Sequence, residues 1–299
     1  MAMSTVMGLV ESSWQGRCAL RTAFLAARAG EGAAAGGHVV GLYPVPAAEC
    51  LTPQTMASSR ESLGQPGEDV LAVLERAERQ GGAGVEAARH VFEEVARSLG
   101  AEFLERPPNG GQLTACFKPQ PRGGPDDVAA QGRVFDLVVV RQPRDDRNHR
   151  VRKTLRAVLF EAGRPVLVAP ATEPASLGRR PLIAWNGSAR SARAAAIARN
   201  FFSGAAEVGI LSVHSQERTG PSARELADYV AWHGLAARVV EVELQGRRLG
   251  DVILREAADF GADLLVMGAY AQSPFRESLT GGVTNHVLSH AELPVLMTH

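Results

Sequence analysis

Short apolar runs alternate with amphipathic segments along most of this chain. A run of about four to eight apolar residues between turn signals is typical of a buried strand, and apolar residues spaced i, i+3, i+4 and i+7 predict one face of a helix. In the second half the pattern predicts strands at 182–185, 207–213, 240–244, 263–268 and 294–298. It predicts helices between them, with Ser188 as an N-cap, Pro221 at a first helical position, Gly261 as a C-cap and a last helix opening after Gly281.

The first half repeats this order less clearly. The pattern predicts strands at 6–10, 38–43, 101–104, 135–140 and 165–170. It predicts helices after residue 13, from Glu68 to Arg79, from Ala88 to Leu99 and from Val151 to Leu159. Gly81 and Gly82 are expected to end the second of these helices. Residues 44–66 and 105–133 are rich in Pro or Gly, which predicts irregular structure.

The two halves also share sequence. The segment 135–141 (FDLVVVR) corresponds to 262–268 (ADLLVMG), and a Pro-Val-Leu triplet follows each one, at Pro165 and Pro294. Strands alternating with helices favour parallel sheets with helices on both faces. We therefore interpret the chain as a duplicated α/β unit, with a domain at 1–170, a linker at 171–180 and a domain at 181–299. Two unrelated α/β domains are the alternative.

Three segments of the second half carry a family resemblance. Residues 263–268 (DLLVMG), 279–283 (LTGGV) and 290–296 (HAELPVL) resemble a universal stress protein domain, and the first half resembles a degenerate copy, mainly over 135–170. The resemblance implies a tandem member of that family. Each unit would be a Rossmann-like (adenine nucleotide alpha hydrolase-like) five-stranded parallel sheet flanked by helices. It also implies that residues 166–168 pair with 295–297, which would make the chain an intrachain pseudo-dimer.

Nucleotide-binding members of the family carry Gly-x2-Gly-x9-Gly followed by Ser or Thr, and an Asp after the first strand. Glycine lets the backbone approach a phosphate closely, and amides at a helix start attract anions. The matching positions here, with the residues that follow the motif, are Gly268, Ala271, Gly281, Gly282, Val283, Thr284 and, after the first strand, Asn186. Ala271 replaces a glycine, Gly282 replaces the hydroxyl and Asn186 replaces the Asp. We take these residues as the candidate site for ATP or AMP.

The corresponding turn of the first half differs, because Arg141 stands where Gly268 stands in the second. A bulky side chain in that turn would obstruct a phosphate. The resemblance therefore assigns nucleotide binding to the second half.

Composition narrows the classes of function. The chain has 32 basic and 32 acidic residues, so no overall field draws it to nucleic acid or to a membrane surface. The basic cluster between Arg141 and Arg156 lacks interleaved aromatic residues, which favours a solvated helix face or a protein contact. Three widely spaced cysteines suit a reducing compartment. With no basic leader and no apolar run of about 18 residues, we expect a cytoplasmic protein.

Other chemistry has weaker support. His286 and His290 have a spacing that can bind zinc, but no Glu or Cys completes a set of ligands, so we expect no metal site. No nucleophile or phosphate-loop motif indicates catalysis. The family resemblance implies a stress-response binding or regulatory module with an unknown protein partner. A ligand-free structural dimerisation scaffold and a weak ATP-hydrolysing enzyme are the alternatives. Whether two copies of the chain also form a homodimer stays open.

Overall fold

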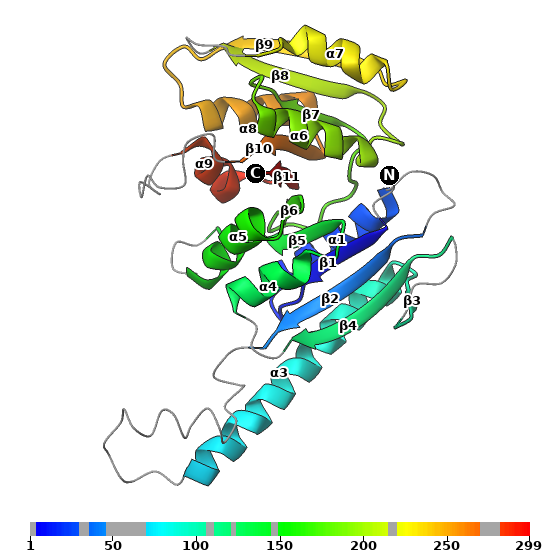
Figure 1. The fold of residues 1–299 in the computed structure, drawn as a ribbon, viewed down its shortest axis with the longest axis vertical. Coiled ribbons are helices and arrows are strands. Elements are labelled where there is room, and N and C mark those ends of the chain that lie inside the picture. Colours follow the sequence, from blue (N-terminus) through cyan, green and yellow to red (C-terminus); the bar gives the residue numbers. More distant parts are fainter. Residues whose placement is uncertain are drawn as a thin grey trace.

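In a computed structural model the strands form one sheet of eleven strands, in the order β3-β4-β2-β1-β5-β6-β11-β10-β7-β8-β9 (Figure 1). Every neighbouring pair is parallel except β6 with β11. The predicted α/β class is therefore confirmed. The structure describes residues 4–29, 36–45, 70–105, 111–120, 124–144, 149–214, 220–269 and 282–299, with backbone only at 70–81.

The second half follows the predicted alternation of strands and helices. Its elements are β7 (Pro181–Ala184), α6 (Ala189–Ala198), the short 3₁₀ helix η2 (Arg199–Phe201), β8 (Val208–His214), α7 (Ala223–Ala231), β9 (Ala237–Glu243), α8 (Leu249–Phe260), β10 (Leu264–Gly268), α9 (Val283–His290) and β11 (Val295–Thr298). Ser188 caps α6 and Gly261 ends α8 in the left-handed conformation, as predicted. Helix α7 begins later than predicted, because Ser222 and Glu225 form a capping box after Pro221.

The first half has the same core order with an addition at its outer edge. Its elements are β1 (Thr5–Leu9), α1 (Trp14–Ala29), β2 (His38–Pro44), α3 (Val70–Ser98), β3 (Glu102–Phe103), β4 (Thr114–Gln120), α4 (Pro125–Gly132), β5 (Leu137–Arg141), α5 (His149–Glu161) and β6 (Val166–Ala169). Five strands match those of the second half in order, and the two-residue β3 adds a sixth.

Two predictions for the first half were wrong. Helix α3 runs without a break through Gly81 and Gly82, where the sequence predicted an end. Glycine weakens a helix by about 1 kcal/mol without forbidding it, and the second part of α3 gains packing from Ala88 and Phe92. Residues 105–133 were expected to be irregular, yet they contain β4 and α4. Strand β4 pairs with β2 over seven residues. These long-range hydrogen bonds stabilise an extended conformation that the local composition did not predict.

The two halves join edge to edge in the middle of the sheet (Figure 1). Val168 pairs with Val295 and Val166 pairs with Met297, antiparallel, on either side of Leu167 and Leu296. The predicted pairing of these strands is confirmed. All eight residues of β6 and β11 are buried, so the junction is part of the core.

Each face of the sheet carries one hydrophobic core that extends through both halves. Helices α1, α3, α6 and α7 contribute to the core on one face, which contains Phe24, Phe92 and Phe201. Helices α4, α5, α8 and α9 contribute to the core on the other. None of the helices in the described part of the chain is both long and apolar enough to cross a membrane.

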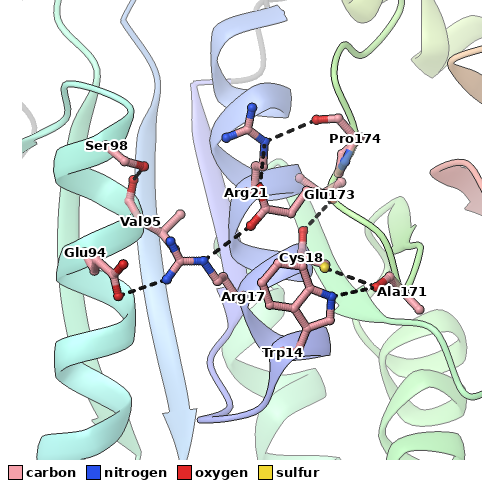
Figure 2. Close-up of polar contacts among 11 residues, drawn as sticks. Trp14, Arg17, Cys18, Arg21, Glu94, Val95, Ser98, Ala171, Glu173 and Pro174 are labelled. Atoms are coloured by element: carbon pink, nitrogen blue, oxygen red, sulfur yellow. Dashed lines mark hydrogen bonds and ion pairs between the residues drawn. The ribbon is translucent and has the colours of Figure 1, made fainter.

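The segment between the halves is fastened to the first turns of α1 (Figure 2). The carbonyl oxygen of Ala171 accepts hydrogen bonds from Trp14 Nε1 at 3.2 Å and from Cys18 Sγ at 3.3 Å. Glu173 lies 3.3 Å from Arg17, which also pairs with Glu94 at 2.9 Å. These bonds fix the path of the chain as it leaves β6.

An aspartate in the same position of each half fixes the start of the first strand. Asp136 accepts hydrogen bonds from the amides of Ser4 and Thr5, both at 2.9 Å. Asp263 accepts them from the amides of Arg179 and Arg180, also at 2.9 Å. The Asp-Leu pair shared by the two repeats therefore has a structural role that the sequence alone did not show.

Candidate functional site

The strand registers show which positions of the two halves are equivalent. Asp136 and Asp263 precede β5 and β10, and Leu137 pairs with Val6 as Leu264 pairs with Pro181. Counting along the strands from these pairs makes Glu11 equivalent to Asn186, Arg141 to Gly268 and Gln142 to Ala269. The predicted correspondence between the two halves is thus repeated in three dimensions.

In the second half, the carboxyl end of β10 lies against the first turn of α6. A Cβ atom added to Gly268 would come within 2.8 Å of Arg190 Cβ and 2.9 Å of the Ser191 amide nitrogen. Any side chain at Gly268 would therefore force α6 away from the strand. This glycine allows a close approach of helix and strand, and the same approach brings the helix start to the candidate site.

Asn186 lies in the turn between β7 and α6. Its side-chain oxygen accepts a hydrogen bond from the Ser188 amide at 3.1 Å, and Gly187 has a φ of 74°, in the left-handed region. Trp185 Nε1 donates to the carbonyl oxygen of Pro221 at 2.8 Å, which ties this turn to the loop before α7. The amide of Asn186 is therefore oriented by its own turn, beside the N-terminus of α6.

The second predicted group surrounds the start of α9. Gly282 is the N-cap, is exposed, and has no side chain to cap the helix; a Cβ there would meet nothing within 4 Å among the described residues. Val283 is half-buried, whereas Thr284 is buried and faces the protein. Thr284 thus does not stand in for the missing hydroxyl at the surface. Ala271 and Gly281 lie outside the described residues.

One residue next to this site was missed in the sequence. Arg190 lies in the first turn of α6, its carbonyl oxygen accepts a hydrogen bond from Thr298 Oγ1 at 3.1 Å, and its guanidinium lies 3.5 Å from His299 Nε2. Burial, with the positive charges of Arg190 and Arg193, lowers the pKa of His299. The predicted N-cap at Ser188 puts Arg190 in the first turn of the following helix, at the carboxyl end of the sheet. The N-cap could therefore have identified Arg190 from the sequence.

The equivalent site of the first half is occupied by the protein itself. Arg141 Nε lies 2.6 Å from Glu11 Oε2, so the side chain at the Gly268 position bonds to the side chain at the Asn186 position. Arg150, in the first turn of α5, donates to the carbonyl oxygen of Pro44 at 3.0 Å. The structure places the Arg141 side chain in this turn, where the ion pair with Glu11 holds it, and the obstruction of a phosphate there stays a prediction.

The two histidines of α9 interact with each other rather than with a set of metal ligands. The rings of His286 and His290 stack with centroids 4.3 Å apart, and His286 Nε2 lies 2.6 Å from Asp251 Oδ1. Helix α8 accommodates this ring at Gly250, where a Cβ would lie 2.6 Å from His286 Cδ2. Among the described residues no group of three or more His, Cys, Asp or Glu side chains could hold a metal ion.

Comparison with known proteins now defines the class of this fold. Residues 179–299 match the universal stress protein family. The structure of a universal stress protein from Archaeoglobus fulgidus DSM 4304 is similar over 98% of this chain and 95% of that chain, with a TM-score of 0.64 and 14% sequence identity. No curated protein matches the chain.

Two further solved structures are similar. A functionally unknown protein from Pseudomonas aeruginosa PAO1 has a TM-score of 0.51 and 16% identity, and the match covers 99% of this chain and 92% of that chain. A universal stress protein in complex with cAMP has 22% identity and a TM-score of 0.34, covering 42% of this chain and 99% of that chain. The match to the universal stress protein family thus lies in the second half of the chain, and the similarity of fold to a universal stress protein extends over both halves.

Proposed function

We propose that this protein is a cytoplasmic stress-response regulatory module that binds an adenine nucleotide, ATP or AMP, in its second half. The observation that carries the proposal is the contrast between equivalent turns. In the second half, Gly268 leaves the carboxyl end of β10 without a side chain, beside Arg190. In the first half, Arg141 and Glu11 fill the same place. The cytoplasmic location rests on the free thiols of Cys18 and Cys116.

The chemistry of the second-half residues suits a nucleotide with few phosphates. The exposed start of α9 at Gly282 offers backbone amides, and the positive end of the helix dipole favours an anion there. The site has no Ser or Thr hydroxyl at Gly282 and a neutral amide at Asn186. The match of residues 179–299 to the universal stress protein family supports a role in the stress response. The nucleotide would act by changing a surface that a protein partner recognises.

Titration calorimetry with ATP, AMP and cyclic AMP tests the proposal, with two substitutions at Gly282 as a matched pair. The position is exposed and open, so both variants are expected to fold, and both Ser and Asp are good N-caps. Gly282→Ser supplies the missing hydroxyl and should tighten binding about 3- to 10-fold. Gly282→Asp stabilises the helix equally but repels phosphate, and should weaken binding about 10-fold or more.

Two results would overturn the proposal: no heat at millimolar nucleotide with the wild-type protein, or equal affinities for the Ser and Asp variants. Mass spectrometry of the supernatant released by heating the purified protein gives an independent test, because a retained nucleotide should appear there.

The proposal treats the protein as a binding module rather than an enzyme. Sensitive measurement of phosphate release from ATP tests this part, with Gly268→Arg, which copies the first half, as the control. A release rate above that of the control would support the weak ATP-hydrolysing alternative.

A further inference from the structure

One polar side chain crosses the buried junction between the halves. Gln142 follows β5, is 4% exposed, and donates from Nε2 to the carbonyl oxygen of Ala291 at 2.9 Å. Ala291 is the C-cap residue of α9, so a first-half side chain bonds to the end of a second-half helix. The last carbonyl groups of a helix lack partners within the helix, and Gln142 supplies a donor just beyond this end.

The bond has no counterpart at the equivalent position of the second half. Gln142 N donates to Ala169 O at 2.9 Å, and Ala269 N donates to Thr298 O at 2.9 Å, which makes Gln142 and Ala269 equivalent. Ala269 has no side chain long enough to reach the end of α5. The halves are related by a pseudo-two-fold arrangement of strands, yet at this pair of equivalent positions Gln142 alone reaches the end of a helix in the other half. At a different place, Ser203 Oγ of the second half donates to the carbonyl oxygen of Ala29, the last residue of α1, at 3.3 Å.

The packing around Gln142 indicates that its side-chain amide contributes little to the stability of the protein. Its Oε1 is buried and has no hydrogen-bond partner among the described residues. The small space around it is lined by apolar side chains of both halves, among them Val168, Leu288 and Leu293. A buried amide with one group unsatisfied stabilises little or nothing compared with an apolar residue of similar shape. A role in placing α9 accounts for an amide here.

We propose that Gln142 is a positioning residue through which the first half fixes α9, and therefore sets the nucleotide affinity of the second half. Helix α9 has eight residues, with Gly282 at one end and Ala291 at the other. Because the helix is short, a displacement of Ala291 is expected to displace the amides after Gly282 as well. This inference rests on the proposed function for the affinity, but the fixing of α9 stands on the bond itself.

The experiment compares Gln142→Met with Val39→Ala in the full chain. Methionine keeps the length and volume of the side chain and removes both polar groups. Val39 is buried in β2, away from the junction, so its truncation lowers the stability of the first half without touching α9. Two quantities are measured: hydrogen exchange of the α9 amides, and the affinity for AMP by calorimetry.

For Gln142→Met we expect exchange of the α9 amides to accelerate about 3- to 10-fold and AMP affinity to fall by a similar factor, with an unfolding constant within about threefold of the wild type. For Val39→Ala we expect a larger loss of stability with AMP affinity unchanged. Equal AMP affinity for Gln142→Met and wild type would overturn the inference and leave the proposed function intact.

If the wild type binds no AMP, the proposed function fails together with the effect on affinity. Hydrogen exchange then decides about the positioning of α9: faster exchange in Gln142→Met alone supports it, and unchanged exchange overturns it.

Discussion

The two halves of this protein keep the same frame and differ at the same turn. Asp136 and Asp263 hold the first strand of each half through equivalent amides. At the carboxyl ends of the strands, however, the first half has an ion pair between Arg141 and Glu11, whereas the second has Gly268 and Asn186. The comparison teaches that two halves with the same strand order and the same fixing aspartates can differ in the side chains at this turn.

The largest effect is expected from the shared aspartates. Asp263→Ala removes the acceptor of the Ser176 hydroxyl at 2.7 Å and of two backbone amides. We expect a loss of about 3 kcal/mol in the free energy of unfolding, measured in urea, because hydrogen bonds to a charged acceptor are strong. Asp136→Ala should cost about the same, about 3 kcal/mol, because Asp136 likewise accepts from two backbone amides and from the Thr5 hydroxyl at 2.9 Å. Losses below about 0.5 kcal/mol for both variants would refute the common role.

Gly268→Ala is expected to cost about 2 kcal/mol, because its new methyl group would press on Arg190 and on the backbone of Ser191. The same substitution should remove nucleotide binding by displacing the start of α6. Urea unfolding and calorimetry measure the two effects. A variant with full stability and full affinity would show that the close packing at this turn is unimportant.

Breaking the ion pair of the first half should cost less. Arg141→Ala leaves Glu11 without its partner at 2.6 Å, and the partial exposure of the Glu11 side chain limits the loss to about 1 kcal/mol. We expect no nucleotide binding to appear in the first half, which lacks a glycine at the Gly282 position. Appearance of a second binding event in calorimetry would contradict this.

The smallest expected effect is a pH dependence of the free energy of unfolding that arises from a histidine of the first half. Burial lowers the pKa of His38, whose Nδ1 lies 2.8 Å from Thr114 Oγ1. The unfolded chain therefore binds a proton near pH 6.5 that the folded protein resists, so stability should fall as the pH drops below about 6.5, by less than about 1.4 kcal/mol per pH unit. The equivalent position of the second half holds Glu207, so the second half has no buried histidine there.

Urea unfolding at pH 7.5 and 5.5 tests this effect in the wild type and in His38→Gln. The difference in stability between the two pH values should be smaller in the variant. An unchanged difference would assign the acid sensitivity to other groups.

The sequence predicted the second half well because four of its five strands are largely buried and its helices carry clear caps, such as Ser188 and Gly261. It missed β4 and α4 in the first half, where pairing with β2 overrides a composition rich in Pro and Gly. The partner of Arg141 is 130 residues away, at Glu11, and no local pattern reports such a contact. The bond from Gln142 to Ala291 escaped for the same reason.

The central claim is that the second half binds the nucleotide and the first half does not. Hydrogen exchange measured by mass spectrometry, with and without saturating AMP, tests it most directly. We predict slower exchange in peptides that contain Asn186 to Ser191, Gly268 and Gly282 to Thr284, and no change in those that contain Glu11 or Arg141. Protection of the Glu11 and Arg141 peptides, or of neither half, would contradict it.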